Sequence, residues 1–318
     1  MIPLPESLKI GISACLLGMP VRFNGGHKNS RLCSEVLARY FTLVPVCPEL
    51  AVGLGTPRQP IRLIGEPQQP RAVGTRNAAL DVSDGLRAFG RQVAAEAHEL
   101  CGFIVMQKSP SCGMERVKVY DDDGQSASSR GRGLFTAALM QARPDLPVEE
   151  EGRLNDPVLR ENFITRVYVY AAWQRLLRSG LSHRALYSFH ARYKYQLMAN
   201  SREQYQAIGR MLAQNRDPLD VFAPRYFSAL MDALRRPASR GSHSNVLQHL
   251  SGYFKRSLNS HDRQELQQLI ERYRLGQIPL VVPMTLLKHH LRHHPDRYLA
   301  EQAYLQPHPD ALSLRNAL

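Results

Sequence analysis

Short apolar runs alternate with segments of helical periodicity over the first half of the chain. Runs typical of buried strands occupy residues 8–14, 41–46 and 102–107. Apolar residues recur at helical spacing over 30–40, 78–100 and 132–143. Strands that alternate with helices favour a parallel sheet covered by helices. The predicted fold class of this half is therefore α/β, a Rossmann-like parallel sheet.

The segments between these elements are richer in turn-forming residues. Residues 50–74 contain many Gly and Pro residues and are predicted to form a long loop, with a short strand at Ile61–Ile64. A loop of this length is uncommon in a compact domain unless it has a function. A polar hairpin is expected around 120–124. Residues 144–156, which include the acidic run 149–151, are expected to be a linker.

Beyond this linker the periodic segments all indicate helices. The predicted helices span 157–178, 193–214, 217–235, 243–258, 260–274 and 281–293. Prolines separate several of them. The predicted organisation is an α/β domain over residues 1–150 and an all-α domain over residues 151–318.

Charge is distributed unevenly between these two parts. Residues 1–150 carry a net charge of +2 and residues 151–318 carry +11, which gives the +13 of the whole chain. Ten of the twelve histidines and eleven of the thirteen tyrosines also lie in the second part. A basic, aromatic-rich part indicates a polyanion-binding module attached to a second function. The alternative is a basic surface that only contacts solvent.

Composition also indicates where the protein works. No apolar run approaches the roughly 18 residues of a membrane span, and the mean hydropathy is −0.33. Residues 1–5 lack the features of a signal peptide, so we expect a cytoplasmic location with reduced thiols. Five cysteines in 318 residues do not make a disulfide framework.

Three of these cysteines follow predicted strands. Cys15 closes the first run, Cys47 closes the second, and Cys112 follows the third across a short turn. Because the carboxyl ends of parallel strands share one edge, the three thiolates are placed to converge. Three thiolates suit an iron–sulfur cluster in which one iron lacks a protein ligand. The alternative is three buried structural cysteines, since free Cys is often buried.

The surroundings of the cysteines differ. Cys112 lies in a Ser-Pro-Ser-Cys-Gly turn that presents N–H groups and hydroxyls, and Glu49 follows Cys47 by two residues. Cluster sulfurs and bound anions both favour nearby donors. Cys33 and Cys101 have no such setting and are predicted to be packing residues.

Four motifs, in this order, resemble those of the thiouracil desulfidase family over about residues 7–145. They are Ser13-Ala14-Cys15-Leu16-Leu17-Gly18, Val21-Arg22-Phe23-Asn24-Gly25-Gly26, Pro45-Val46-Cys47-Pro48-Glu49 and Lys108-Ser109-Pro110-Ser111-Cys112-Gly113. The family usually has Tyr-Asp-Gly-Gly where this chain has Phe-Asn-Gly-Gly, so position 24 lacks the acidic side chain.

The second part resembles an uncharacterised-domain family over about residues 185–305. The resemblance rests on 189–195, on 243–249 with 252–255, and on 279–283 with 286–290. The fused arrangement is similar to that of the RNA 4-thiouridine desulfidases, whose joining segment matches residues 155–180.

The resemblance implies a bacterial enzyme that converts 4-thiouridine in tRNA to uridine by non-redox cleavage of the carbon–sulfur bond. Cys15, Cys47 and Cys112 would bind a 4Fe-4S cluster whose open iron takes the thiocarbonyl sulfur. Glu49 would transfer protons, with partial burial bringing its titration toward the working pH. Ser109 would hydrogen-bond the substrate or position the water, whereas Ser111 would cap the turn.

The basic part is expected to hold RNA while a base is extruded for reaction. The predicted contacts are Arg192, Tyr193, Lys194, Tyr195, Lys288 and Arg292. Two alternatives stay open at this point. The first is the same chemistry on free thiouracil or a thiolated nucleotide, with the helical part serving oligomerisation. The second is a non-catalytic RNA-binding protein with a redox-sensing cluster.

Overall fold

The computed structural model describes residues 7–121, 123, 127–309, 312 and 315. Residues 1–5, in which we expected no signal peptide, lie outside this part, as do two positions of the predicted 120–124 turn. The chain divides into two compact units, Met1–Asn155 and Asp156–Leu318. None of the described helices is both long and apolar enough to cross a membrane.

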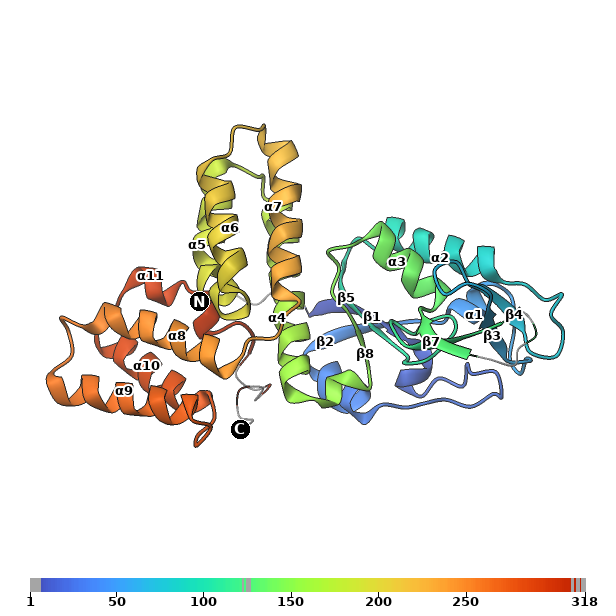
Figure 1. Cartoon of the computed structure of the whole chain (residues 1–318), viewed down its shortest axis with the longest axis horizontal. Helices are drawn as coiled ribbons and strands as arrows, with labels where there is room; N and C mark the ends of the chain where they lie inside the picture. Colours follow the sequence, from blue (N-terminus) through green and yellow to red (C-terminus); the bar gives the residue numbers. More distant parts are fainter. Residues whose placement is uncertain (1–6, 122, 124–126, 310–311, 313–314, 316–318) are drawn as a thin grey trace. The chain divides into compact units, whose positions relative to one another are not determined.

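Sheet A is the centre of the first unit (Figure 1). Its four strands run parallel in the order β2-β1-β5-β8. They span Phe41–Val46 (β2), Leu8–Ser13 (β1), Leu100–Val105 (β5) and Val148–Glu150 (β8). After β1 the chain forms β2 on one side of it, and later forms β5 on its other side. This parallel sheet confirms the predicted Rossmann-like α/β class.

Helix α3 (Leu134–Ala142) packs on sheet A, and helix α2 (Ser83–Glu96) packs against α3. Phe135 of α3 contacts Phe103 of β5, with 5.6 Å between the ring centroids. Phe103 lies against the neighbouring strand, where a Cβ at position 11 would be 2.4 Å from its ring. Gly11 is therefore needed for the central strands and the helical layer to pack closely.

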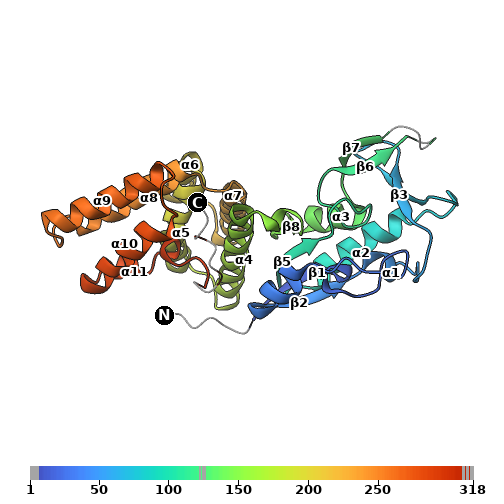
Figure 2. The ribbon, with the colours of Figure 1, turned by 90° about the horizontal axis from the view of Figure 1, so that it is seen from below.

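Sheet B is a smaller, mixed sheet of order β4-β3-β6-β7, shown in Figure 2 beside the strands of sheet A. Its strands span Arg71–Gly74 (β4), Ile61–Ile64 (β3), Val117–Tyr120 (β6) and Ala127–Gly131 (β7). One face carries apolar residues of β3 and β6 into a core shared with α2. The strands β6 and β7 flank the predicted polar hairpin.

Two expectations for this unit were wrong. The predicted linker contains β8, and its glutamates are buried because they have partners. Arg153 Nε binds Glu149 at 2.7 Å, and the backbone N–H groups of Met114 and Gln107 donate to Glu150 and Glu151 at 2.9 and 2.8 Å. The predicted 50–74 loop also contains β4 in addition to the expected β3.

The second unit is helical, as predicted (Figure 1). Its longer helices are α4 (Pro157–Arg178), α5 (His183–Asn200), α6 (Arg202–Ala213), α7 (Leu219–Leu234), α8 (Arg240–Ser251), α9 (Ser260–Arg274) and α10 (Val281–His293), and a short α11 spans Arg297–Ala300. Capping side chains determine where several of these helices begin. Asp156, Asn259 and Ser239 each accept backbone N–H bonds at the beginning of α4, α9 and α8.

One predicted helix, 193–214, is two helices in the structure. The chain breaks at Ser201, whose backbone is extended and whose hydroxyl accepts the N–H of Gln204 at the start of α6. An N-cap bond of this kind stabilises a new helix rather than the continuation of the old one. The core of the unit includes an aromatic group in which Trp173 stacks on Phe227 at 4.6 Å.

Candidate active site

The three cysteines predicted to converge line one pocket at the carboxyl ends of sheet A strands. Cys15 lies in a short 3-10 helix directly after β1, and Cys47 directly follows β2. Ser13 and Val46 are opposite each other in the register of these two strands. Cys112 follows β5 across a turn. Because β2 and β5 flank β1, the pocket lies at the topological switch point, where open α/β sheets bind ligands.

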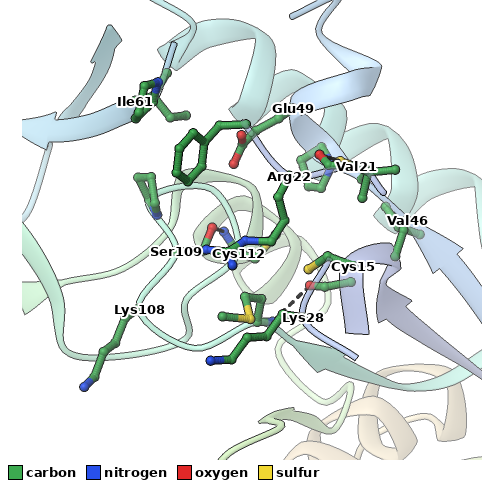
Figure 3. Close-up of a pocket in the computed structure, with 18 of the residues that line it drawn as sticks. Cys15, Val21, Arg22, Lys28, Val46, Glu49, Ile61, Lys108, Ser109 and Cys112 are labelled. Carbon is green, nitrogen blue, oxygen red and sulfur yellow. Dashed lines mark hydrogen bonds between the residues drawn. The ribbon is translucent and has the colours of Figure 1, made fainter. Parts of the chain in front are cut away.

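The pocket has a volume of about 460 Å³, within the range of small-molecule sites. Figure 3 shows Cys15, Arg22 and Glu49 directed toward its interior. Lys28 and Lys108 also line it. Arg58 lines it as well, so thiols, a carboxylate and four cationic side chains share one cavity.

All three cysteines are free thiols in the structure. Burial, together with the nearby Cys47, raises the pKa of Cys15 to about 11. Burial also raises the pKa values of Cys47 and Cys112. Uncompensated thiolates are therefore disfavoured here, whereas a bound cation would stabilise them. Cys33 is fully buried outside this pocket, and Cys101 is 8% exposed, in keeping with packing roles.

The turn that carries Cys112 is fixed by a serine. Ser109 Oγ accepts the backbone N–H groups of Ser111 at 3.3 Å and Cys112 at 3.1 Å. Thr136 Oγ1 donates to the carbonyl oxygen of Cys112 at 2.7 Å. The backbone at Gly133 also passes so close that a Cβ there would be 2.6 Å from the Cys112 nitrogen. These contacts set the position of the Cys112 thiol.

Glu49 is held between two donors. Arg58 donates to Glu49 Oε2 from Nε at 2.9 Å and from Nη2 at 2.6 Å. Ser111 Oγ donates to Glu49 Oε1 at 2.8 Å. The Arg58 side chain is only 5% exposed and also donates to the Val21 carbonyl at 2.9 Å. Both oxygens of the carboxylate are thus oriented at the pocket wall.

These contacts add to the expected roles of the two serines. Ser109 caps the turn and also lines the pocket, so its contact with substrate or water stays a prediction. Ser111, which was expected to cap the turn, orients Glu49. The expectation for Glu49 also left out Arg58, which binds its carboxylate through two nitrogens. Sequence reasoning missed Arg58 as a site residue. The only sequence signal for a functional role of Arg58 was its position in the 50–74 segment, which is longer than a simple connection needs to be.

The predicted RNA-contacting residues of the helical unit differ in exposure. Arg192 and Lys288 are half-buried, and Arg292 is exposed. Tyr193 is buried, with its ring centroid 4.7 Å from that of Phe189. Tyr193 is 6% exposed and Tyr195 only 4%, so burial argues against a stacking role for either ring.

Lys194 lies in an aromatic setting. Its Nζ is 5.2 Å from the ring centroids of both Tyr195 and Tyr298. The Tyr195 ring is largely buried, and its hydroxyl donates to that of Tyr253 at 3.3 Å. Lys194 and Tyr195 line a cavity of about 210 Å³ that also includes Arg202. This region combines positive charge with aromatic surface, although little of Tyr195 itself is accessible.

Comparisons with known proteins agree with this division. The 2-thiouracil desulfurase family model matches residues 10–151, and a family described as a protein of unknown function, DUF1722, matches residues 194–309. The chain belongs to the 2-thiouracil desulfurase family through its first unit. A DUF1722 domain is fused to it.

Individual relatives correspond to about half of the chain each. The uncharacterized protein YbgA of Escherichia coli K12 is 33% identical over 162 residues, which cover 49% of this chain and 94% of YbgA. The uncharacterized protein YbbK of Bacillus subtilis 168 is 30% identical over 151 residues, 46% of this chain and 97% of YbbK. The solved structure of the 4Fe-4S-dependent thiouracil desulfidase TudS is 30% identical, with a TM-score of 0.38 over 48% of this chain and 95% of that one.

Proposed function

We propose that this protein is an iron–sulfur-dependent desulfidase that converts 4-thiouridine in tRNA to uridine and releases hydrosulfide. The observation that carries the proposal is the shared pocket of Cys15, Cys47 and Cys112, with Glu49 on its wall. Membership in the desulfurase family supports the reaction class. The basic helical unit supports a polyanionic substrate.

The donor set fits a cluster. Cys15, Cys47 and Cys112 would hold it, and soft thiolate ligands are those that iron–sulfur sites use. Their raised pKa values fit thiols that become thiolates only when a metal centre compensates the charge. When bound, the cluster would supply Lewis-acid activation of a thiocarbonyl group through an iron without a protein ligand.

The protein's own groups would handle water and protons. In the overall reaction a water oxygen forms a bond to C4 of the base, the carbon–sulfur bond breaks, and sulfur leaves as hydrosulfide. Glu49 would accept a proton from the attacking water, because Arg58 and Ser111 orient its carboxylate at the pocket wall. Arg22, which lines the same pocket, is placed to attract anionic groups. No net electron transfer is required.

The helical unit would bind the RNA around the target. A base within folded RNA must leave its stack before it enters a pocket, so the enzyme must hold the surrounding backbone. The net charge of +11 over residues 151–318 suits phosphate contacts. Lys194, Arg192 and Arg292 are the groups on which this part of the proposal rests.

The substrate test compares three substrates with anaerobically purified holoprotein. These are thiolated tRNA, 4-thiouridine nucleoside and 2-thiouracil, each followed by the loss of thiocarbonyl absorbance in the near ultraviolet. We expect the highest kcat/KM with tRNA. Turnover of the small molecules alone would refute the RNA part of the proposal, and the absence of turnover with all three would refute the enzymatic function.

The cofactor test uses two matched cysteine variants. Cys15→Ser removes a proposed ligand, whereas Cys33→Ser changes a buried cysteine outside the pocket. We expect Cys15→Ser to lose most of its iron, acid-labile sulfide and activity. We expect Cys33→Ser to keep all three. Equal iron and sulfide contents in the two variants would contradict the assigned ligand set.

A second candidate is desulfuration of free 2-thiouracil. The family description names this substrate, and a pocket of about 460 Å³ has room for a single base. In that case 2-thiouracil would exceed tRNA in kcat/KM in the three-substrate test.

A further inference from the structure

A second cavity adjoins the active-site pocket within the first unit. Its volume is about 810 Å³, and it shares Ile61, Gln107, Lys108 and Pro110 with the walls of the first pocket. Shared walls make the two cavities neighbours, so a molecule whose base enters the first can extend into the second. We refer to this second cavity as the side groove.

The strands β3, β6 and β7 of sheet B contribute half of the residues that line the side groove. Leu63 of β3 is paired with Val119 of β6, and both are buried in the core. Side chains alternate across a strand, so the preceding residues, Arg62 and Lys118, lie side by side on the opposite face. Tyr120 shares that face, and the Arg62 guanidinium lies 5.7 Å from its ring centroid. One face of this small sheet is therefore apolar, and the other is basic and aromatic.

Two further cations reach the side groove from strained positions. Lys108 and Arg116 have φ values of 58° and 54°, and in the described part of the chain they are the two non-glycine residues with a positive φ. Both line the side groove. A left-handed backbone costs energy for residues with a Cβ, and such strain concentrates at functional sites. Both strained residues are basic and line the same cavity, which points to a ligand there rather than to a packing role.

The carboxylates of the side groove already have partners. Glu150 is 3% exposed and accepts the backbone N–H groups of Met114 and Glu115. Glu115 binds Arg116 at 2.9 Å and Arg153 at 3.0 Å. In contrast, Arg62 Nε is buried and has no hydrogen-bond partner among the described residues. Arg62 lines the side groove and has no ion-pair partner among the described residues, so its charge can serve an anionic ligand there.

We propose that the side groove binds a backbone phosphate of the RNA next to the nucleotide whose base occupies the active-site pocket. Arg62 and Lys118 supply the charge, with Lys108 at the junction of the two cavities, and the exposed part of Tyr120 offers a surface for sugar or base. This inference rests on the proposed desulfidase function. It adds a substrate contact within the catalytic unit that a free base cannot use.

The test uses Lys118→Gln, Arg62→Gln and the double variant as holoproteins. Arg91→Gln is the matched control, because Arg91 is an exposed arginine of α2 that does not line either cavity. Each protein is assayed with 4-thiouridine nucleoside, its 5′-monophosphate and thiolated tRNA. Binding of tRNA without turnover is measured in parallel over a range of salt concentrations.

We expect each single variant to lower the ratio of kcat/KM for tRNA to kcat/KM for nucleoside about tenfold, because removal of a charge-assisted hydrogen bond costs about 1.5 kcal/mol or more. The slope of log K against log salt should become shallower by about one for each phosphate that the variant no longer binds. A penalty confined to tRNA identifies a neighbouring phosphate, and an equal penalty with the 5′-monophosphate identifies the phosphate of the target nucleotide itself.

Failure of this inference is separable from failure of the proposed function. If the wild type desulfurates its substrates but the variants keep both the tRNA-to-nucleoside ratio and the salt slope of the Arg91→Gln control, the side groove does not bind phosphate. If the wild type desulfurates nothing, the proposed function fails. The salt slope for tRNA binding then still decides whether Arg62 and Lys118 contact RNA.

Discussion

The guanidinium of Arg58 donates two hydrogen bonds to Glu49 Oε2, from Nε at 2.9 Å and from Nη2 at 2.6 Å. The arginine side chain is 5% exposed, and that of the glutamate is 17% exposed. A pair shielded to this degree differs from a surface ion pair, because each charge depends on the other for its solvation. Arg58 therefore acts as a positioning residue, because it fixes the carboxylate of the proposed proton acceptor at the pocket wall.

Replacement of Arg58 should be costly for both stability and activity. Arg58→Ala leaves the Glu49 charge without its partner, so we expect a loss of about 3 kcal/mol in the free energy of unfolding and at least a tenfold lower kcat. Arg71→Ala is the matched control, because its pair with Asp81 is exposed and spans 4.0 Å. It should cost at most about 1 kcal/mol. Calorimetry and steady-state kinetics check both variants, and equal losses in the two would contradict the positioning role.

The two serines of the Cys112 turn should give different phenotypes. Ser111→Ala removes the hydrogen bond to Glu49, so we expect a lower kcat with normal iron content. Ser109→Ala removes the acceptor for two backbone N–H groups of the turn. We expect it to lose cluster more readily and to be about 1 kcal/mol less stable. Iron retention on dilution and kcat, measured for both variants, separate the two roles. The reverse pattern would restore the roles expected from sequence alone.

Local signals made much of the fold predictable. The helices at 157–178, 260–274 and 281–293 were predicted with the observed bounds, because caps, prolines and apolar spacing all lie within a few residues of the ends. The convergence of Cys15, Cys47 and Cys112 was predictable for a different reason. Strand–helix alternation implies a parallel sheet, and a parallel sheet has one shared carboxyl edge.

The errors arose where a distant partner determines the outcome. A run of glutamates at 149–151 looks like a solvated linker until Arg153 and two backbone segments are placed around it. Arg58 is one of many arginines in the sequence, and only the fold of the 50–74 segment brings it to Glu49. Ser111 and Ser109 are chemically equivalent in the sequence, so their roles depend on the direction in which each hydroxyl points.

Stability of the helical unit should depend on pH through Glu161. Burial alone raises the pKa of Glu161. Arg315, whose Nε lies 2.7 Å from Oε1, and His308, whose Nε2 lies 3.8 Å from the same oxygen, together outweigh burial and lower this pKa from 4.5 to about 2. A depressed carboxyl pKa stabilises the folded state above pH 4.5, and this contribution is lost as the pH falls from there toward 2. Its size at neutral pH is about 3 kcal/mol.

Fluorescence of Trp173 can report this effect, because the one tryptophan of the chain lies in the helical unit. We expect Glu161→Gln to lower the urea midpoint at pH 7 and to approach the wild type as the pH is lowered toward 2. Glu301→Gln is the control, since its pair with Arg297 is exposed and should change the midpoint little at either pH. A difference between wild type and Glu161→Gln that does not change with pH would rule out this linkage.

The glycine at position 133 should be essential for the Cys112 thiol to keep its place. A Cβ there would lie 2.5 Å from the carbonyl carbon of Ser111 and 2.6 Å from the Cys112 nitrogen, and a backbone cannot move aside as a flexible side chain can. Gly133→Ala should therefore shift the turn, reduce iron binding severalfold and lower the free energy of unfolding by about 2 kcal/mol or more.

Gly209→Ala is the opposite case, because Gly209 lies within α6 and a Cβ there meets no atom within 4 Å. It should gain about 0.5–1 kcal/mol from helix propensity and leave the iron content unchanged. Iron analysis and thermal unfolding of both variants check these expectations. If Gly133→Ala binds as much iron as the wild type, the turn does not position Cys112 as a ligand.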